Sequence, residues 1–257
     1  MTFPVIYNIL GLHVPAHAVF ELAGYAIGFQ TFRLIRRRTP SDQRLPLETT
    51  VWLIAGAILG AAIGSKVLAW IESWPEYWAV RNDPALWLGG KTIVGGLLGG
   101  WIGVEFAKRY NGVRHNTGDA FVLPLLIGIA IGRIGCFLEG LPDHTFGIAT
   151  NLTWGIDFGD GIHRHPTQLY ESFLMLPLGL LIWWRSRWPY ERGELFRLFL
   201  LGYLLFRLAV EFIKPTYRPY GGLSAIQVAS ACGIAALIIS LYRLILAGPL
   251  AGHSSAT

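Results

Sequence analysis

Long apolar stretches alternate with short polar connections along the whole chain. Seven of them are long enough to cross about 30 Å of hydrocarbon as a helix rising 1.5 Å per residue. They are residues 17–35, 49–70, 89–107, 118–138, 166–184, 195–213 and 223–246. This pattern predicts an all-α polytopic membrane protein with about seven transmembrane helices, forming one transmembrane domain over residues 1–257.

The basic residues between these stretches predict an orientation. Thirteen of them fall in the connections after stretches 1, 3 and 5 and on the C-terminal side: Arg33, Arg36, Arg37, Arg38, Arg44, Lys108, Arg109, Arg114, Arg185, Arg187, Arg192, Arg197 and Arg243. Four fall on the opposite side: Arg81, Arg164, Lys214 and Arg218. Because cytoplasmic loops carry the excess of Lys and Arg, we expect the N-terminus outside and the C-terminus inside.

Composition supports a membrane protein and narrows its chemistry. The chain is 53% hydrophobic and 14% charged, and its mean hydropathy is +0.46. The net charge of +5 follows from the loop arginines and does not indicate a nucleic-acid partner. Both cysteines, Cys136 and Cys232, lie in predicted spans, and their spacing predicts neither a disulfide framework nor a metal site. The glycine-rich stretch Gly89–Gly103 is typical of close helix packing rather than of a phosphate-binding loop.

Two arginines interrupt apolar stretches and are the strongest functional candidates. Arg133 lies in Leu125–Phe137, and Arg207 lies in Leu198–Ile213. A charge at membrane depth costs several kcal/mol, about 3 on insertion scales, so such residues usually serve a function. The planar guanidinium donates two parallel hydrogen bonds to a phosphate, which predicts phospholipid binding. The alternative for Arg133 is that its long side chain only extends to place the guanidinium at the membrane–water interface.

The second arginine belongs to a spaced set. Tyr203, Arg207 and Glu211 follow one another at four-residue intervals and therefore share a helix face, which Lys214 continues. We expect Tyr203 and Glu211 to orient Arg207. The alternative is an Arg207–Glu211 ion pair that only fixes helix packing, although desolvation makes such pairs an inefficient source of stability.

The longest polar segment is the expected outer loop, residues 139–165, which directly follows the Arg133 stretch. A long polar loop at this place predicts the rim of a site. His165 then precedes a helix that starts with a proline and carries Gln168, Tyr170 and Glu171 in its first turns. Taken alone, this pattern also fits an ordinary helix start.

Three stretches together resemble the prolipoprotein diacylglyceryl transferase family: Gly132–Phe137 (GRIGCF), Arg164–Glu171 (RHPTQLYE) and Leu201–Lys214 (LGYLLFRLAVEFIK). The resemblance runs in order over most of the chain. It implies a multi-pass enzyme of the bacterial inner membrane. Such an enzyme transfers the diacylglyceryl group of phosphatidylglycerol to a cysteine thiol of a lipoprotein precursor and releases glycerol 1-phosphate. It needs neither a cofactor nor a metal.

The resemblance and the residue patterns together give the expected roles. The expected catalytic residues are Arg133, Arg207, His165 and Glu211. The expected substrate-binding residues are Arg133, Gly135, Gln168, Tyr170, Glu171, Tyr203, Arg207 and Lys214.

This chain departs from the family pattern at several places, including Lys214, where another arginine is usual. Val94 stands where the family has a histidine proposed as a base, Cys136 where it has an asparagine, and Glu21 where it has a tyrosine. The candidates for a replacement base are His165, His144 and Glu139 of the outer loop, and His165 is the best placed of them by sequence. The alternative function is a non-catalytic or differently specific membrane lipid-binding protein that keeps the arginine clamp.

Overall fold

The computed structural model describes residues 2–9, 11–40, 44–79, 82, 87 and 89–246. Arg81 and the side chain of Arg243, both used in the orientation argument, lie outside the described residues. The same holds for residues 41–43 of the first inner connection and for residues 247–257.

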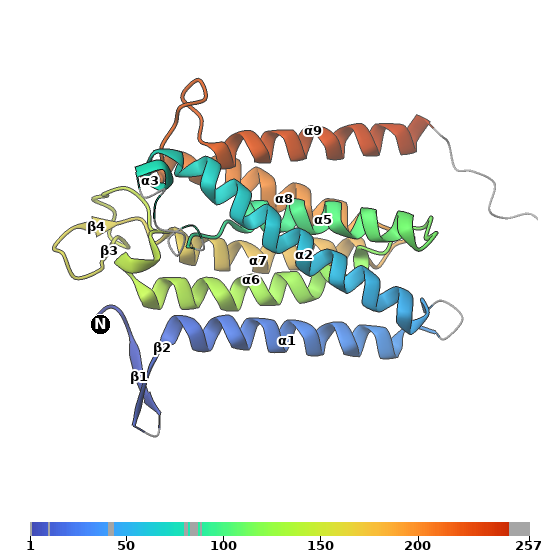
Figure 1. Cartoon of the computed structure of the whole chain (residues 1–257), viewed down its shortest axis with the longest axis horizontal. Helices are drawn as coiled ribbons and strands as arrows, with labels where there is room; N and C mark the ends of the chain where they lie inside the picture. Colours follow the sequence, from blue (N-terminus) through green and yellow to red (C-terminus); the bar gives the residue numbers. More distant parts are fainter. Residues whose placement is uncertain are drawn as a thin grey trace, which may run out of the picture.

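Each predicted apolar stretch forms one helix. These are α1 (Ala16–Arg38), α2 (Leu47–Glu72), α5 (Ile93–Tyr110), α6 (Asp119–Glu139), α7 (Thr167–Arg185), α8 (Glu194–Val210) and α9 (Ala225–Leu246). They run along the long axis of the molecule (Figure 1). A short helix, α3 (Trp74–Ala79), follows α2, and a 3-10 turn, η3 (Glu211–Ile213), extends α8. The prediction of a mainly helical protein is confirmed. Within the described residues, α2 and α6 are long and apolar enough to cross a membrane by length and composition.

Two small antiparallel hairpins were not predicted. One pairs β1 (Ile6–Ile9) with β2 (Leu12–Pro15), and the other pairs β3 (Ile156–Asp157) with β4 (His163–Arg164). The second turn closes because the carboxylate of Asp157 accepts hydrogen bonds from three backbone N–H groups, those of residues 159, 160 and 161. Such short-range polar closure leaves no periodic apolar signal, so a search for helices misses it. The β3–β4 hairpin and α3 lie at one end of the helices, here called the β3–β4 end (Figure 1).

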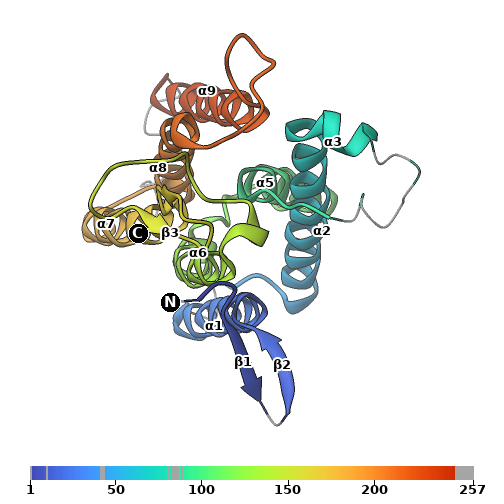
Figure 2. The same cartoon turned by 90° about the vertical axis from the view of Figure 1, so that its left-hand side faces the viewer.

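Three of the long helices pack on α6. Viewed from the β3–β4 end, α6 lies near the middle, with α1, α7 and α8 packed on it, whereas α2 packs mainly on α5 and α9 on α8 (Figure 2). The Ser172 hydroxyl of α7 donates to the Ala130 carbonyl of α6. At the opposite end, the Asp119 carboxylate of α6 accepts from the backbone N–H groups of Gly193 and Phe196 at the start of α8. These contacts fix the positions of α7 and α8 along the axis of α6.

Glycines make the α2–α5 contact almost backbone to backbone. Gly56, Gly60 and Gly64 on α2 face Gly103, Gly99 and Gly95 on α5. A Cβ atom on Gly60 would lie 2.2 Å from the Gly99 carbonyl oxygen, which is too close for any side chain. The prediction that the glycine-rich stretch serves helix packing is therefore confirmed.

Candidate functional site: a buried cluster of arginines and carboxylates

The charged residues predicted from the sequence meet close to the β3–β4 end. Arg133 lies less than two turns from the end of α6, Glu171 lies in the second turn of α7, and Arg207 lies in the last turn of α8. These helix ends come together because α6 and α8 run toward this end and α7 starts from it (Figure 1). Three segments far apart in the sequence thus contribute to one cluster.

Glu171 is the centre of the cluster. Its Oε1 accepts a hydrogen bond from the Tyr203 hydroxyl at 2.5 Å, and its Oε2 accepts one from Nη1 of Arg207 at 3.1 Å. Nε of Arg133 lies 3.2 Å from the same Oε2. One carboxylate therefore holds two guanidinium groups and a phenol.

Glu211 holds Arg207 from the other side. Its Oε2 accepts a hydrogen bond from Nη2 of Arg207 at 2.7 Å, so the four-residue spacing does produce the expected ion pair. Tyr203 differs from the expectation, because its hydroxyl binds Glu171 rather than Arg207. Spacing along one helix cannot reveal a partner on another helix, and Glu171 comes from α7.

The cluster is buried and rich in charged groups. Glu171 and Glu211 are completely buried, while Arg133, Arg207 and Lys214 are 5%, 6% and 6% exposed. Two arginines face two carboxylates in direct contact, and the buried Lys214 and Glu72 add one group of each sign nearby. Taking such charges out of water costs several kcal/mol per ion, so packing alone is a poor reason to keep them.

Several polar atoms in and beside the cluster are unused. Within the described part of the chain, both amide atoms of Gln168, Nε of Arg207 and Oε1 of Glu211 are buried without a hydrogen-bond partner. A buried polar atom without a partner costs roughly 1–3 kcal/mol. The cluster therefore offers free hydrogen-bonding capacity to a polar ligand.

The other predicted site residues lie in different surroundings. His165 and Tyr170 form a group of their own, in which Nδ1 of His165 lies 3.1 Å from the Tyr170 hydroxyl and Nε1–H of Trp154 donates to that hydroxyl at 2.9 Å. Among the interactions of the described residues, neither side chain bonds to Glu171 or to the arginines. Gly135 is a packing position, because a Cβ there would lie 2.8 Å from Cβ of Phe20 on α1.

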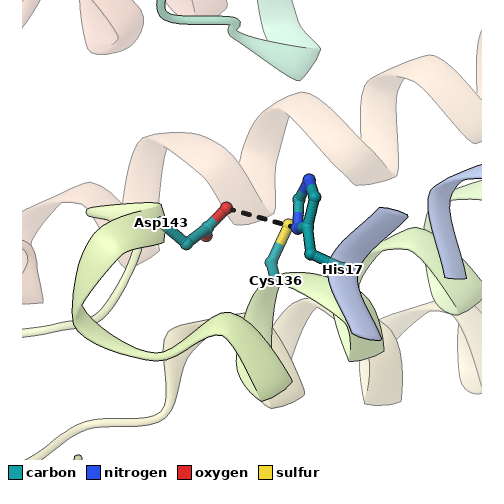
Figure 3. Close-up of side chains that lie close together, drawn as sticks. All are labelled: His17, Cys136 and Asp143. Atoms are coloured by element: carbon teal, nitrogen blue, oxygen red, sulfur yellow. Dashed lines mark ion pairs between the residues drawn. The ribbon is translucent and has the colours of Figure 1, made fainter. Parts of the chain in front are cut away.

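A second polar group, not predicted from the sequence, adjoins the first. His17 at the start of α1, Cys136 in the last turn of α6 and Asp143 of the 3-10 turn η2 (Leu141–Asp143) point toward one another (Figure 3). Nη1 of Arg133 donates to Sγ of Cys136 at 3.3 Å and so links the two groups. Only the closeness of α1 to α6 reveals this arrangement, since His17 and Cys136 are 119 positions apart in the sequence.

Position 94 carries no ionisable group. Val94 is 1% exposed and belongs to the apolar core together with Leu97 and Phe199. Val94 therefore cannot accept a proton.

Comparison with known proteins gives matches over almost the whole chain. A family model described as prolipoprotein diacylglyceryl transferase matches residues 4–243. A phosphatidylglycerol–prolipoprotein diacylglyceryl transferase of Methylobacillus flagellatus is 40% identical over 171 residues, which is 62% of this chain and 64% of that protein. The enzyme of the same name from Bordetella parapertussis is 37% identical over 145 residues, 54% of each chain.

Longer coverage comes from Pseudoalteromonas atlantica. Its protein of the same name is 32% identical over 261 residues, covering 93% of this chain and 90% of that protein. The alignments with the first two relatives span less than two thirds of their length.

Proposed function

Because the chain belongs to the prolipoprotein diacylglyceryl transferase family, we propose that it moves a diacylglyceryl group from phosphatidylglycerol to a cysteine thiol of a lipoprotein precursor. Arg133 and Arg207 bind the phosphate of the lipid. They stabilise the negative charge that grows on the leaving phosphoester. Glu211 and Glu171 orient the arginines, and Tyr203 holds Glu171.

One observation carries this proposal: the buried cluster brings Arg133 and Arg207 to one carboxylate and keeps unused hydrogen-bond donors beside it. A phosphodiester carries one negative charge, and its free oxygens accept hydrogen bonds from guanidinium donors of this kind. The buried amide of Gln168 supplies a donor that the described residues leave unused. Lys214 and Tyr170 complete the proposed lipid-binding set, whereas Gly135 contributes by letting α1 approach.

The test is a transfer assay with the purified protein, phosphatidylglycerol and a synthetic signal peptide with one cysteine. Release of glycerol phosphate and the mass of the peptide are measured. We expect Arg133→Ala and Arg207→Ala to abolish transfer and Arg→Lys at either position to be poorly tolerated, since a point charge cannot replace the guanidinium fork. Arg187→Ala, an exposed arginine stacked on Trp183, is the control. Full activity of both lysine variants would contradict the clamp.

We further propose that the seven helices α1, α2, α5, α6, α7, α8 and α9 form a single domain that spans the bacterial inner membrane. The N-terminus and the β3–β4 end face outward. Reporter enzymes fused after Arg114 or Arg187 should be active as cytoplasmic reporters, and a reporter near Asp160 should be active as an external one. The reverse pattern would move the site to the inner leaflet.

The proton acceptor for the acceptor thiol is a separate question. His165 remains the base predicted from the sequence, and its place at the start of α7 supports it. A positioned base contributes about 10²–10⁴-fold to a rate. We therefore expect His165→Ala to lose a comparable factor if His165 is the base, with the exposed His163→Ala on β4 as control. A smaller effect excludes that role.

The alternative is a protein that binds the lipid without transferring its diacylglyceryl group. The apolar surroundings of Val94 favour it, since no base stands there. Binding of phosphatidylglycerol by the wild type without transfer at any pH, together with transfer by the Val94→His, Cys136→Asn double variant, would support this alternative.

A further inference from the structure

His17, Cys136 and Asp143 bring three different kinds of donor atom to one place at the β3–β4 end (Figure 3). One imidazole nitrogen, one sulfur and one carboxylate oxygen lie within 4.8 Å of one another. Cys136 is a free thiol. We propose that these residues bind a divalent transition metal, Zn²⁺ in the first place, and that its fourth coordination position takes the acceptor's cysteine thiol. The binding of the acceptor thiol rests on the proposed function, whereas the binding of the metal does not.

The geometry is close to that of a zinc site. Bonds of about 2.0–2.3 Å place tetrahedral ligands roughly 3.3–3.8 Å apart. Nδ1 of His17 lies 3.8 Å from Oδ1 of Asp143. That nitrogen is buried and makes no hydrogen bond within the described part of the chain. A shift of about 1 Å in side chains from a helix end and a loop closes the set around a metal.

Neighbouring groups hold the ligands in the way that metal sites require. A ligating histidine usually gives its other nitrogen to a carboxylate. Oε2 of Glu21 lies 3.5 Å from Nε2 of His17, on the side away from Asp143. The Thr145 hydroxyl donates to the Asp143 carboxylate. The same Glu21 binds Lys91 at 2.7 Å and the Tyr25 hydroxyl at 2.8 Å, which fixes its position.

The charges fit a divalent cation. A Cys136 thiolate, Asp143 and Glu21 carry three negative charges, and Lys91 returns one positive charge. A dication makes this group neutral. Arg133, which donates to the sulfur, is itself balanced by Glu171 at 3.2 Å. The metal site and the arginine cluster therefore coexist without a surplus of charge between them.

Three protein ligands leave one open position, as in catalytic zinc sites. A free thiol is only a few per cent thiolate at neutral pH, but a coordinated thiol is deprotonated outright. When the acceptor sulfur binds the metal, its proton leaves to water. The sulfur electron pair then forms a C–S bond with the glyceryl carbon, the C–O bond to phosphate breaks, and its electron pair leaves with the phosphate beside Arg133. The metal thus supplies the activation that Val94 cannot.

The first experiment measures metal binding without any substrate. Full-length protein is purified in detergent with a tag free of histidine, stripped with a chelator and given Zn²⁺ or Co²⁺ alone. We expect about one zinc per chain by elemental analysis and a thiolate-to-cobalt charge-transfer band. His17→Ala, Cys136→Ser and Asp143→Asn should weaken zinc binding at least about tenfold. Cys232→Ser, which alters the chain's other cysteine, and His163→Ala should bind normally.

The cobalt spectrum of the wild type tests sulfur ligation even if a variant fails to fold. Absence of the band, or equal zinc binding by well-folded Cys136→Ser protein, would overturn the site.

A second experiment tests the open position. Adding the cysteine peptide to the cobalt-loaded protein should change the spectrum, while a serine peptide should not. Chelation should lower transfer at least about tenfold, and Zn²⁺ should restore it, whereas Cys232→Ser protein should transfer as the wild type does. If chelation leaves the transfer rate unchanged, the proposal that the metal binds the acceptor thiol is wrong. If zinc and the cysteine peptide both bind but no transfer occurs under any condition, the proposed transferase function fails and the metal site stands.

Discussion

The α2–α5 contact and the α6–α7–α8 cluster are both close contacts between helices, but they depend on opposite properties. On α2 and α5, facing glycines lack side chains, so the two backbones touch. Between α6, α7 and α8, the buried carboxylate of Glu171 contacts two arginines and a tyrosine. The first contact depends on shape alone. The second depends on charge balance, so a change of one atom there has a large effect, and only the second has chemistry to offer a ligand.

The largest effect is expected for Glu171→Gln. It keeps the shape of the side chain and removes the charge that faces Arg133 and Arg207. Breaking a buried ion pair costs about 3–5 kcal/mol, so the variant should unfold earlier and lose transfer. Thermal unfolding in detergent measures this. Glu194→Gln removes the charge facing Arg185 at a partly exposed pair and should cost about 1 kcal/mol or less. Equal losses would show that burial does not set the difference.

A smaller loss is expected for Tyr203→Phe, which removes one hydroxyl that donates to Glu171 at 2.5 Å. A hydrogen bond to a charged group is worth about 1.5–3 kcal/mol. Tyr25→Phe is the matched control, because its hydroxyl also binds a glutamate, Glu21, but on an exposed side chain. Unfolding of both variants is compared, and an unchanged Tyr203→Phe protein would contradict the central place of Glu171.

Gly99→Ala tests the other contact. Its added Cβ would meet the Gly60 carbonyl oxygen at 2.3 Å, so the helices must separate, at a cost of about 1–3 kcal/mol. Gly96→Ala is the control on the same helix, since the nearest atoms there are 3.9 Å away. The stability of the two variants should differ, while lipid binding per folded molecule should stay normal in both. A selective loss of lipid binding in Gly99→Ala would mean that the two regions are not independent.

The smallest effect is expected at the exposed Asp160–Arg164 pair, in which both carboxylate oxygens accept from Arg164 at 2.7 Å. This hydrogen-bonded guanidinium lowers the pKa of Asp160. The lowered pKa means that the pair stabilises the turn at neutral pH and is lost as the pH falls below the ordinary carboxylate range, about 4. Asp160→Asn should leave the unfolding temperature unchanged and only speed hydrogen exchange of the loop amides. A large drop in unfolding temperature would contradict the role given to burial.

The sequence predicted the helices well, because membrane-length apolar stretches have few alternative structures. Residues 118–138, for example, became α6 at Asp119–Glu139. It also identified Arg133, Arg207 and Glu211, since charges in apolar stretches are conspicuous. It did not predict that Glu171 is the shared partner or that His17 and Asp143 approach Cys136. Helix spacing reports only neighbours on the same helix, whereas these contacts depend on how α1, α7 and α8 pack around α6.

The shared carboxylate of Glu171 has a consequence for how this protein can change over generations. Arg133 and Arg207 reach each other through one oxygen atom, Oε2 of Glu171. Substitutions at residues that share a partner do not add, and their interaction energies are about 0.5–3 kcal/mol. Once either arginine is lost, Glu171 keeps only one of its two cationic partners among these arginines. Loss of the second arginine then costs less free energy of folding than the first loss did. The three positions should therefore be kept together or given up together, and a double-mutant cycle on Arg133 and Arg207 measures that epistasis directly.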